Sequence, residues 1–229
     1  INIYGLYLRK RKQDIELLKE ELSQYGVEVI YKKANASNEE SRTQIIDELK
    51  EKENIHIKMF IHSIAFGTLK NMVSKEGSTL NKKNIEMTLD TMCNNIIYWT
   101  QGLFENQLFK KGSHIIAMTS AGGRKNWHSY GAVSLAKAGI ESVCRQLSLE
   151  LANYSISVNA IQAGVTQTEA LKKIPGHKKM IQDAITNNPH GRLTTPSDIA
   201  DFIEVLLSYK SSWMTGNVIR LDGGEDITG

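Results

Sequence analysis

The chain has 229 residues, of which 41% are hydrophobic and 23% charged, and its net charge is +3. This length suits one α/β domain with a full core, and the composition is that of a globular protein. The small net charge argues against a nucleic-acid-binding role, and no signal peptide or run of about eighteen apolar residues indicates a membrane protein. Cys93 and Cys144 lie in apolar stretches without metal-ligand spacing, so we expect a cytoplasmic protein without a metal site.

In the first half of the chain, stretches typical of strands alternate with stretches typical of helices. Hydrophobic runs predict strands at 1–8, 27–31 and 56–63, and amphipathic patterns predict helices at 14–25, 39–52 and 84–109. Residues 68–83 are polar and irregular, so no element is expected there.

The second half continues the alternation. The run from Ile115 to Met118 predicts a buried strand, and a helix follows that reaches Tyr154. Further strands are expected at 155–161 and 218–221, and helices at 168–188, with a break at Pro175-Gly176, and at 197–208. Such alternation predicts an α/β fold in one domain, a Rossmann-like, doubly wound parallel sheet with helices on both faces.

Tyr130 and Lys137 are the residues most indicative of chemistry. They stand seven positions apart in the expected helix, so their side chains share a face just beyond the end of a strand. An ammonium beside a phenol lowers the pKa of the phenol and makes it a proton donor. Ser120, at the strand end, can donate to a substrate carbonyl. The alternatives are a surface tyrosine, a solvated lysine and a serine that stabilises a turn.

Polar residues also follow the earlier strands. Arg9 and Lys10 begin a basic run after the first strand, where a dinucleotide fold meets a 2′-phosphate with cations; this favours NADPH, and a solvated basic patch is the alternative. Asn35 either bonds an adenine edge or caps the following helix. His62 and Ser63 either line the cofactor groove or form an ordinary loop.

Residues 166–195 form a long, polar stretch that is interrupted at Pro175-Gly176. Such a segment suits a movable lid over a substrate, and Thr168 stands where an expected helix N-terminus favours phosphate. Its lysines either receive an acidic carrier domain or phosphopantetheine arm, or are simply solvated.

Together these residues resemble the short-chain dehydrogenase/reductase family over the whole chain. Most members place the tyrosine four residues before the lysine, where this chain has Val133. The spacing Tyr130-x6-Lys137, with the sequence HSIAFG at 62–67, is similar to the enoyl-acyl carrier protein reductases. Residues 168–175 and the later NPxGR at 188–192 resemble the NADPH-dependent type III branch.

The resemblance implies NADPH-dependent reduction of the C=C bond of an enoyl thioester, carried by acyl carrier protein or CoA, in fatty-acid or polyketide-type synthesis. It implies that Tyr130 hydrogen-bonds the thioester oxygen and that Lys137 holds the nicotinamide ribose. Ser120 falls where the family has a serine or a second tyrosine near the substrate. Val165 and Thr168 are implied to hold the carboxamide and pyrophosphate, and the long helices are implied to form homotetramers or dimers.

Two departures from the family pattern stand out. The glycine-rich phosphate loop, with its first strand and helix, is absent, so we expect the domain to be N-terminally incomplete, with that strand belonging between those at 1–8 and 56–63. Asp90 stands where most members have asparagine. The alternatives are therefore a 3-ketoacyl thioester or other carbonyl reductase, for which Ser120 stands thirteen residues before Val133, and a relative that is not an enzyme.

Overall fold

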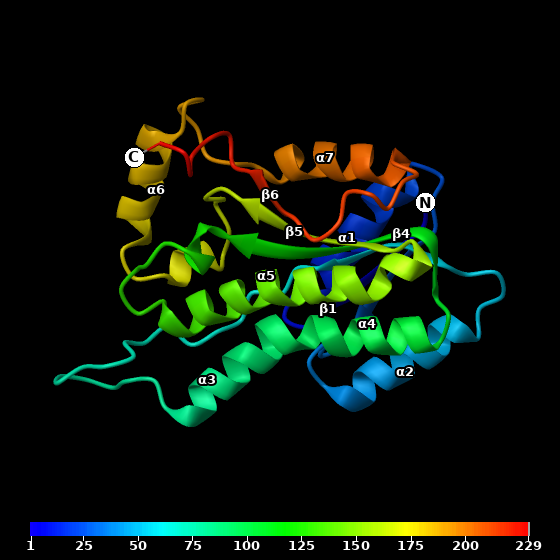
Figure 1. The fold of residues 1–229 in the computed structure, drawn as a ribbon, viewed down its shortest axis with the longest axis horizontal. Helices are drawn as coiled ribbons and strands as arrows, with labels where there is room; N and C mark the ends of the chain where they lie inside the picture. Colours follow the sequence, from blue (N-terminus) through cyan, green and yellow to red (C-terminus); the bar gives the residue numbers. More distant parts are fainter. Residues whose placement is uncertain (229) are drawn as a thin grey trace. The chain divides into compact units, whose positions relative to one another are not determined.

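The computed structural model describes residues 1–228, which divide into two compact units (Figure 1). The first unit comprises Ile1–Glu53, and the second begins at Asn54. Both are built from parallel strands that alternate with helices, so the expected α/β architecture is confirmed. That the two units form one domain remains a prediction.

The first unit is a parallel pair of strands with two helices. Its elements are β1 (Ile3–Tyr7), α1 (Lys12–Ser23), β2 (Val29–Lys33) and α2 (Glu39–Lys50). In the register of the two strands, Ile3 is opposite Val29 and Tyr7 is opposite Lys33. The apolar stripes of the helices are buried through Ile15, Ile45, Ile46 and Leu49, as their amphipathic patterns require.

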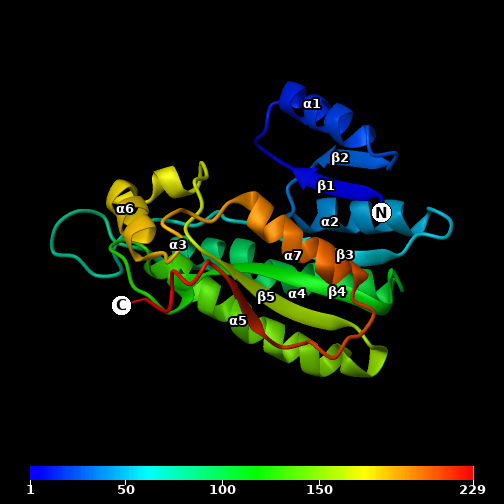
Figure 2. The ribbon, with the colours of Figure 1, turned by 90° about the horizontal axis from the view of Figure 1, so that it is seen from above.

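The second unit contains a four-stranded parallel sheet in the order β3-β4-β5-β6 (Figure 2). The strands are β3 (Ile57–His62), β4 (Phe109–Ser120), β5 (Ser157–Ala163) and β6 (Val218–Leu221). The helices are α3 (Lys82–Leu89), α4 (Asn95–Glu105), α5 (Gly131–Leu151), α6 (His177–Asn187) and α7 (Pro196–Ser208).

Helices cover both faces of this sheet. Figure 1 shows α7 on one face of β4 and β5, and α4 and α5 on the other. Ile116 of β4 and Ile161 of β5 pack with Leu206 of α7 in a buried cluster. Nearly every residue from Gly112 to Ala163 in β4 and β5 is buried, which explains their continuous apolar runs.

Three expected elements differ in detail. The helix expected at 84–109 is divided by a π-helix, Asp90–Asn94, between α3 and α4, and the chain after Glu105 turns into β4, which is much longer than expected. The helix expected from Thr168 is only a 3₁₀ turn, Leu171–Lys173, before α6. Pro175 causes this break, because the residue before a proline favours extended backbone and Ile174 adopts it.

The described residues leave two expectations untested. A further strand between those at 1–8 and 56–63 remains a prediction, as does assembly through the long helices. Within residues 1–228, the longest and most apolar helices fall short of what a membrane crossing requires.

Candidate functional site

The end of β4 and the start of α5 position the first candidate residues. After Ser120 the chain makes a 3₁₀ turn, Ala121–Gly123, and a loop that leads to Tyr130. Tyr130 was expected inside the helix but is its N-cap residue, at φ −99° and ψ 0°. Its carbonyl accepts from the backbone N–H of Ser134 at 2.8 Å, so Tyr130 is still tied to the first turn of the helix.

Ser120 and Tyr130 are brought together around Gly122. A Cβ atom on Gly122 would lie 2.6 Å from a Tyr130 ring carbon and 3.2 Å from Ser120 Oγ, so the glycine provides the space in which the two meet. The lowered pKa expected for Tyr130 is wrong, because burial raises the pKa of the phenol and the nearby Ser120 hydroxyl offsets that rise only in part. Ser120 Oγ is itself shielded from solvent, and its contact with Tyr130 falls short of a well-formed hydrogen bond. A shielded, unsatisfied hydroxyl suits a substrate oxygen.

Lys137 lies in the interior near the end of β4. Its side chain is only 6% exposed, and Nζ donates to the backbone oxygen of Met118 at 2.7 Å. Burial lowers the pKa of Lys137 to about 8, against the opposing negative charge of Glu141. The amine therefore remains mainly an ammonium at neutral pH. It is a buried positive charge seven residues after Tyr130 in the chain.

His62 joins this region from the end of β3. It is 3% exposed; burial first and the charge of Lys137 second lower its pKa to about 4, against an opposing contact with Asn95. The imidazole is therefore neutral and lies near the lysine ammonium. Ser63, by contrast, is exposed. The structure brings His62, but not Ser63, into the buried cluster.

The sequence interpretation missed two polar residues of this cluster. Glu141 is 8% exposed and accepts a hydrogen bond from Thr119 Oγ1 at 2.9 Å. Its position four residues after Lys137 in an apolar helix was a usable signal, because such residues share a helix face.

Asn95, the second missed residue, is 1% exposed and contacts His62. Asp90, which stands at the position expected to hold the family's asparagine, begins the π-helix and is partly exposed. The π-helix lies between Asp90 and Asn95, and such bulges often occur at functional sites. No sequence pattern pointed to this bulge.

The expected cofactor contacts of Val165 and Thr168 are engaged within the chain. The Val165 N–H donates to Glu225 Oε2 at 3.0 Å, and its carbonyl accepts from the Thr194 N–H at 3.2 Å. Thr168 is exposed, and its Oγ1 accepts from the Leu171 N–H at 3.2 Å. A carboxamide can accept from the Val165 N–H only if Glu225 releases it, whereas the Val165 carbonyl has a second lone pair to offer.

Three expected cofactor residues belong to the first unit. Arg9 and Lys10 follow β1 and are exposed. Asn35 follows β2, where its side-chain oxygen accepts from the Ser37 N–H at 3.1 Å. The expectation that Asn35 could cap the following helix is wrong, because Asn38 caps α2 by accepting from the Ser41 N–H.

A cavity of about 290 Å³ adjoins Tyr130. Four of its lining residues come from the first turns of α5, and the others are Met72, Asn126, Trp127 and Tyr130. The Trp127 and Tyr130 rings meet edge to face with centroids 6.2 Å apart. The cavity therefore offers a largely aromatic and aliphatic surface next to the candidate proton donor.

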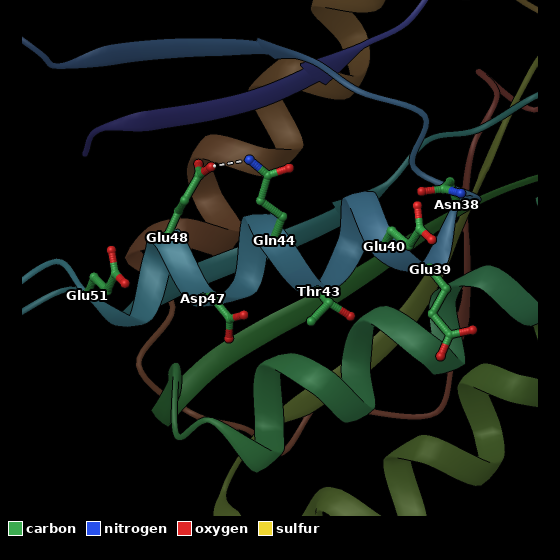
Figure 3. Close-up of a pocket in the computed structure, with 8 residues that line it drawn as sticks. All are labelled: Asn38, Glu39, Glu40, Thr43, Gln44, Asp47, Glu48 and Glu51. Atoms are coloured by element: carbon green, nitrogen blue, oxygen red, sulfur yellow. Dashed lines mark hydrogen bonds between the residues drawn. The ribbon is translucent and has the colours of Figure 1, made fainter.

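A larger cavity of about 940 Å³ lies in the first unit and is open to solvent (Figure 3). All its lining residues belong to α2 or its caps, and five of them are carboxylates. Figure 3 shows these side chains along the helix, with Gln44 hydrogen-bonded to Glu48. Carboxylates repel the phosphates of a dinucleotide, so this surface carries none of the expected chemistry.

Solved structures define the fold class of the chain. The enoyl-acyl carrier protein reductase of Bacillus cereus, solved with NADP+ and indole naphthyridinone, matches the whole chain with a TM-score of 0.87 and 23% identity, over 87% of its own length. The enoyl-acyl carrier protein reductase (NADH) of Aquifex aeolicus also matches the whole chain, with a TM-score of 0.83 and 23% identity. The match covers 87% of the Aquifex protein. The chain therefore has a Rossmann-like fold.

Sequence comparison gives the family. The model described as enoyl-(acyl carrier protein) reductase matches residues 2–225, so the chain belongs to that family. The NADH enoyl reductase FabI of Buchnera aphidicola is 28% identical over 169 residues, 74% of this chain and 64% of that protein. FabI of Synechocystis sp. is 31% identical over 176 residues, 76% of this chain and 66% of that protein. The chain thus spans about two thirds of the length of these relatives.

Proposed function

We propose that this chain catalyses NADPH-dependent reduction of the C=C bond of an enoyl thioester in fatty-acid or polyketide-type synthesis in the cytoplasm. The observation that supports the proposal is the meeting of Ser120 and Tyr130 around Gly122, with the buried Lys137 ammonium bonded to Met118 of the same strand, in a chain of the enoyl reductase family. The Tyr130-x6-Lys137 spacing supports the same assignment.

The residues of the second unit fit a nicotinamide and a thioester. A reduced nicotinamide, when bound, supplies the hydride. Tyr130 donates a hydrogen bond to the thioester oxygen, where negative charge develops, and the nearby Lys137 ammonium favours that charge. Ser120 offers a second hydroxyl to the same oxygen, and Lys137 also holds the ribose. Because hydrogen-bond donors held in a low-dielectric site act strongly on developing charge, the burial of this cluster assists the reaction.

The choice of cofactor rests on charge at the first unit. FabI of Buchnera is named for NADH, whereas the Bacillus cereus structure contains NADP+. Arg9 and Lys10 are exposed after β1, and we propose that they meet the 2′-phosphate of NADPH, as in the type III branch. Asn35 would bond the adenine, and His62 and Ser63 would line the cofactor groove. Val165 and Thr168 would hold the carboxamide and the pyrophosphate.

The substrate is proposed to arrive as a thioester of acyl carrier protein or CoA. Lysines at 172, 173, 178 and 179 stand in the segment 166–195, which we propose as the lid, although Lys172 is paired with Glu169. A basic lid attracts an acidic carrier. Assembly into tetramers or dimers is proposed on the family resemblance alone.

The test measures NADPH and NADH oxidation with crotonyl thioesters by the chain and by Tyr130→Phe. We expect NADPH to be preferred and Tyr130→Phe to lower kcat about 100-fold or more, because general acid catalysis contributes about that much. Tyr154→Phe, at an exposed tyrosine on the same segment of chain, is the matched control and should not change kcat. Unchanged turnover in Tyr130→Phe would remove Tyr130 from the mechanism.

A ketoreductase is the second candidate, because Ser120 lies beside the catalytic region at the position such enzymes use. Val133 is 6% exposed and has no proton to donate, so this candidate lacks its acid. Parallel assays with acetoacetyl and crotonyl thioesters separate the two reductases, and a titration that shows no NADPH binding would favour a relative that is not an enzyme.

A further inference from the structure

Two consecutive residues at the end of β4 hold two residues of α5 that are one turn apart. The Met118 carbonyl accepts from Lys137 Nζ at 2.7 Å, and the Thr119 hydroxyl donates to Glu141 Oε1 at 2.9 Å. Lys137 and Glu141 are 6% and 8% exposed, so both charged side chains are almost fully enclosed. Their spacing on the helix places them on one face, the face turned to the strand end.

Gly123 completes the enclosure of the carboxylate. A Cβ atom on Gly123 would lie 2.9 Å from Glu141 Oε1, which no real Cβ atom tolerates without movement of its neighbour. The 3₁₀ turn after β4 therefore packs directly against this carboxylate. Burying a carboxylate is costly unless it is hydrogen-bonded and near a positive charge, and Thr119 and Lys137 supply both conditions.

From this arrangement we propose that Glu141 is a positioning residue, whose negative charge keeps the Lys137 amine protonated and whose hydrogen bond fixes Thr119 beside Ser120. The inference rests on the proposed reductase function, because it gives the ammonium a task there. Glu141 itself touches neither substrate nor cofactor in this scheme. It acts through Lys137, whose charge the proton donor Tyr130 needs.

The titratable groups that surround Lys137 and Glu141 are His62 and Cys144, and neither carries a charge at neutral pH. Burial lowers the pKa of Lys137 to about 8, and Glu141 opposes that change. His62, which faces Lys137 from β3, has a pKa of about 4 and carries no charge at neutral pH. Cys144, which faces Glu141 from the same helix, has its pKa raised to about 12, chiefly by burial, and is also neutral. Glu141 therefore offsets part of the cost of burying the ammonium, together with the Met118 carbonyl that accepts from Nζ.

The experiment uses the whole chain and compares Glu141→Gln with Glu141→Ala. Glutamine still offers an oxygen to the Thr119 hydroxyl but removes the charge. We expect the alkaline limb of the kcat/KM profile to move about one pH unit lower in Glu141→Gln, because a nearby opposite charge shifts a pKa by about that much. Glu150→Gln, on the exposed side of α5, is the matched control and leaves the profile unchanged. If only Glu141→Ala differs from the unmodified chain, Glu141 is merely structural and the proposal falls.

A second measurement needs no turnover. The folded pKa of Lys137, about 8, lies below its ordinary value of 10.5, so the unfolded chain binds the proton more strongly between these values and stability rises with pH there. We expect the rise of stability with pH to begin about one pH unit lower in Glu141→Gln. It should be absent from Lys137→Met and from the double variant that also carries Glu141→Gln. An identical onset in both Glu141→Gln and the unmodified chain overturns the inference. If the unmodified chain reduces no thioester, the proposed function fails separately and these unfolding curves alone decide the role of Glu141.

Discussion

Two groups of charged residues lie at the strand ends of the second unit, and their cations differ in burial. In the first, Lys137 and Glu141 are enclosed between β4 and α5. In the second, the Asp226 carboxylate is 4% exposed, but its partners, Lys125 at 3.0 Å, Arg220 at 3.6 Å and Arg124, are 42–47% exposed.

The comparison shows that burial of the cation decides whether a charge pair ties two segments together or leaves an amine with a shifted pKa. Burial alone would raise the pKa of Asp226, but Lys125, Gln162 and Arg124 outweigh it and lower that pKa to about 2. Asp226 thus stays ionised and ties the C-terminal segment to the residues that follow β4 and lie on β5 and β6. In the enclosed group the same forces leave Lys137 with a pKa of about 8, near the range where proton chemistry operates.

The sharpest test of this contrast is Lys137→Met. We expect kcat to fall about 100-fold or more, because the charge that supports the Tyr130 proton donor is lost. The free energy of unfolding should also fall, by about 3 to 5 kcal/mol, because this variant leaves the Glu141 carboxylate buried without the positive charge that compensates it. Enoyl thioester reduction and thermal unfolding, measured on one preparation, check both parts. Full activity in this variant would show that the enclosed group has only a structural role.

A second, smaller effect is expected from Gly122→Ala. The added methyl would stand 2.6 Å from the Tyr130 ring and 3.2 Å from Ser120 Oγ, so the phenol must move. We expect a loss of about 10-fold in kcat, because a displaced catalytic group forfeits orientation. Ala121→Ser, at the neighbouring position of the same turn, is the control. Gly26→Ala would not serve, because Gly26 has a positive φ. Unaltered kcat in Gly122→Ala would place the reacting oxygen away from Ser120 and Tyr130.

Asp226→Asn tests the second group, in which the cations are half-exposed. We expect the free energy of unfolding to fall by about 1 kcal/mol at neutral pH, because half-exposed cations are screened by water. The pKa of Asp226 is lowered in the folded state, so its contribution is present above its ordinary value of 3.8 and is lost as the pH falls through about 2. Urea unfolding at neutral pH and near pH 2 checks this, and the two proteins should converge as the pH falls to about 2, while kcat at neutral pH stays unchanged.

The smallest effect belongs to Arg192→Met. Arg192 pairs with Asp198 at 2.7 Å on the surface, and the pair raises the pKa of Arg192 and lowers that of Asp198. Because exposed pairs are screened, we expect a slight drop in the unfolding midpoint that disappears at high salt. Thr195, which caps α7, is untouched by this change. A drop that persists at high salt would mean that this pair behaves like the enclosed one.

Local pattern explains what could be predicted from the sequence. The strands and most helices follow from apolar periodicity, and Tyr130 and Lys137 from their spacing at a strand end. The partner of Lys137 was within reach, because Glu141 is only one turn away. The bond from the Val165 N–H to Glu225 was not, since sixty residues separate them and only the folded chain brings them together. Asn95 was missed because its orientation depends on a π-helix.

That π-helix, Asp90–Asn94, has a consequence for the alignment of this chain with its relatives. A π turn accommodates one residue more than an α turn, so the helix continues after it with its faces offset by about 100°. Removing one residue there would swing the buried side of α4, with Asn95, Ile96 and Trp99, out of its packing. An alignment that carries no single-residue gap against a relative with an unbroken helix will pair inward positions with outward ones from residue 95 onward.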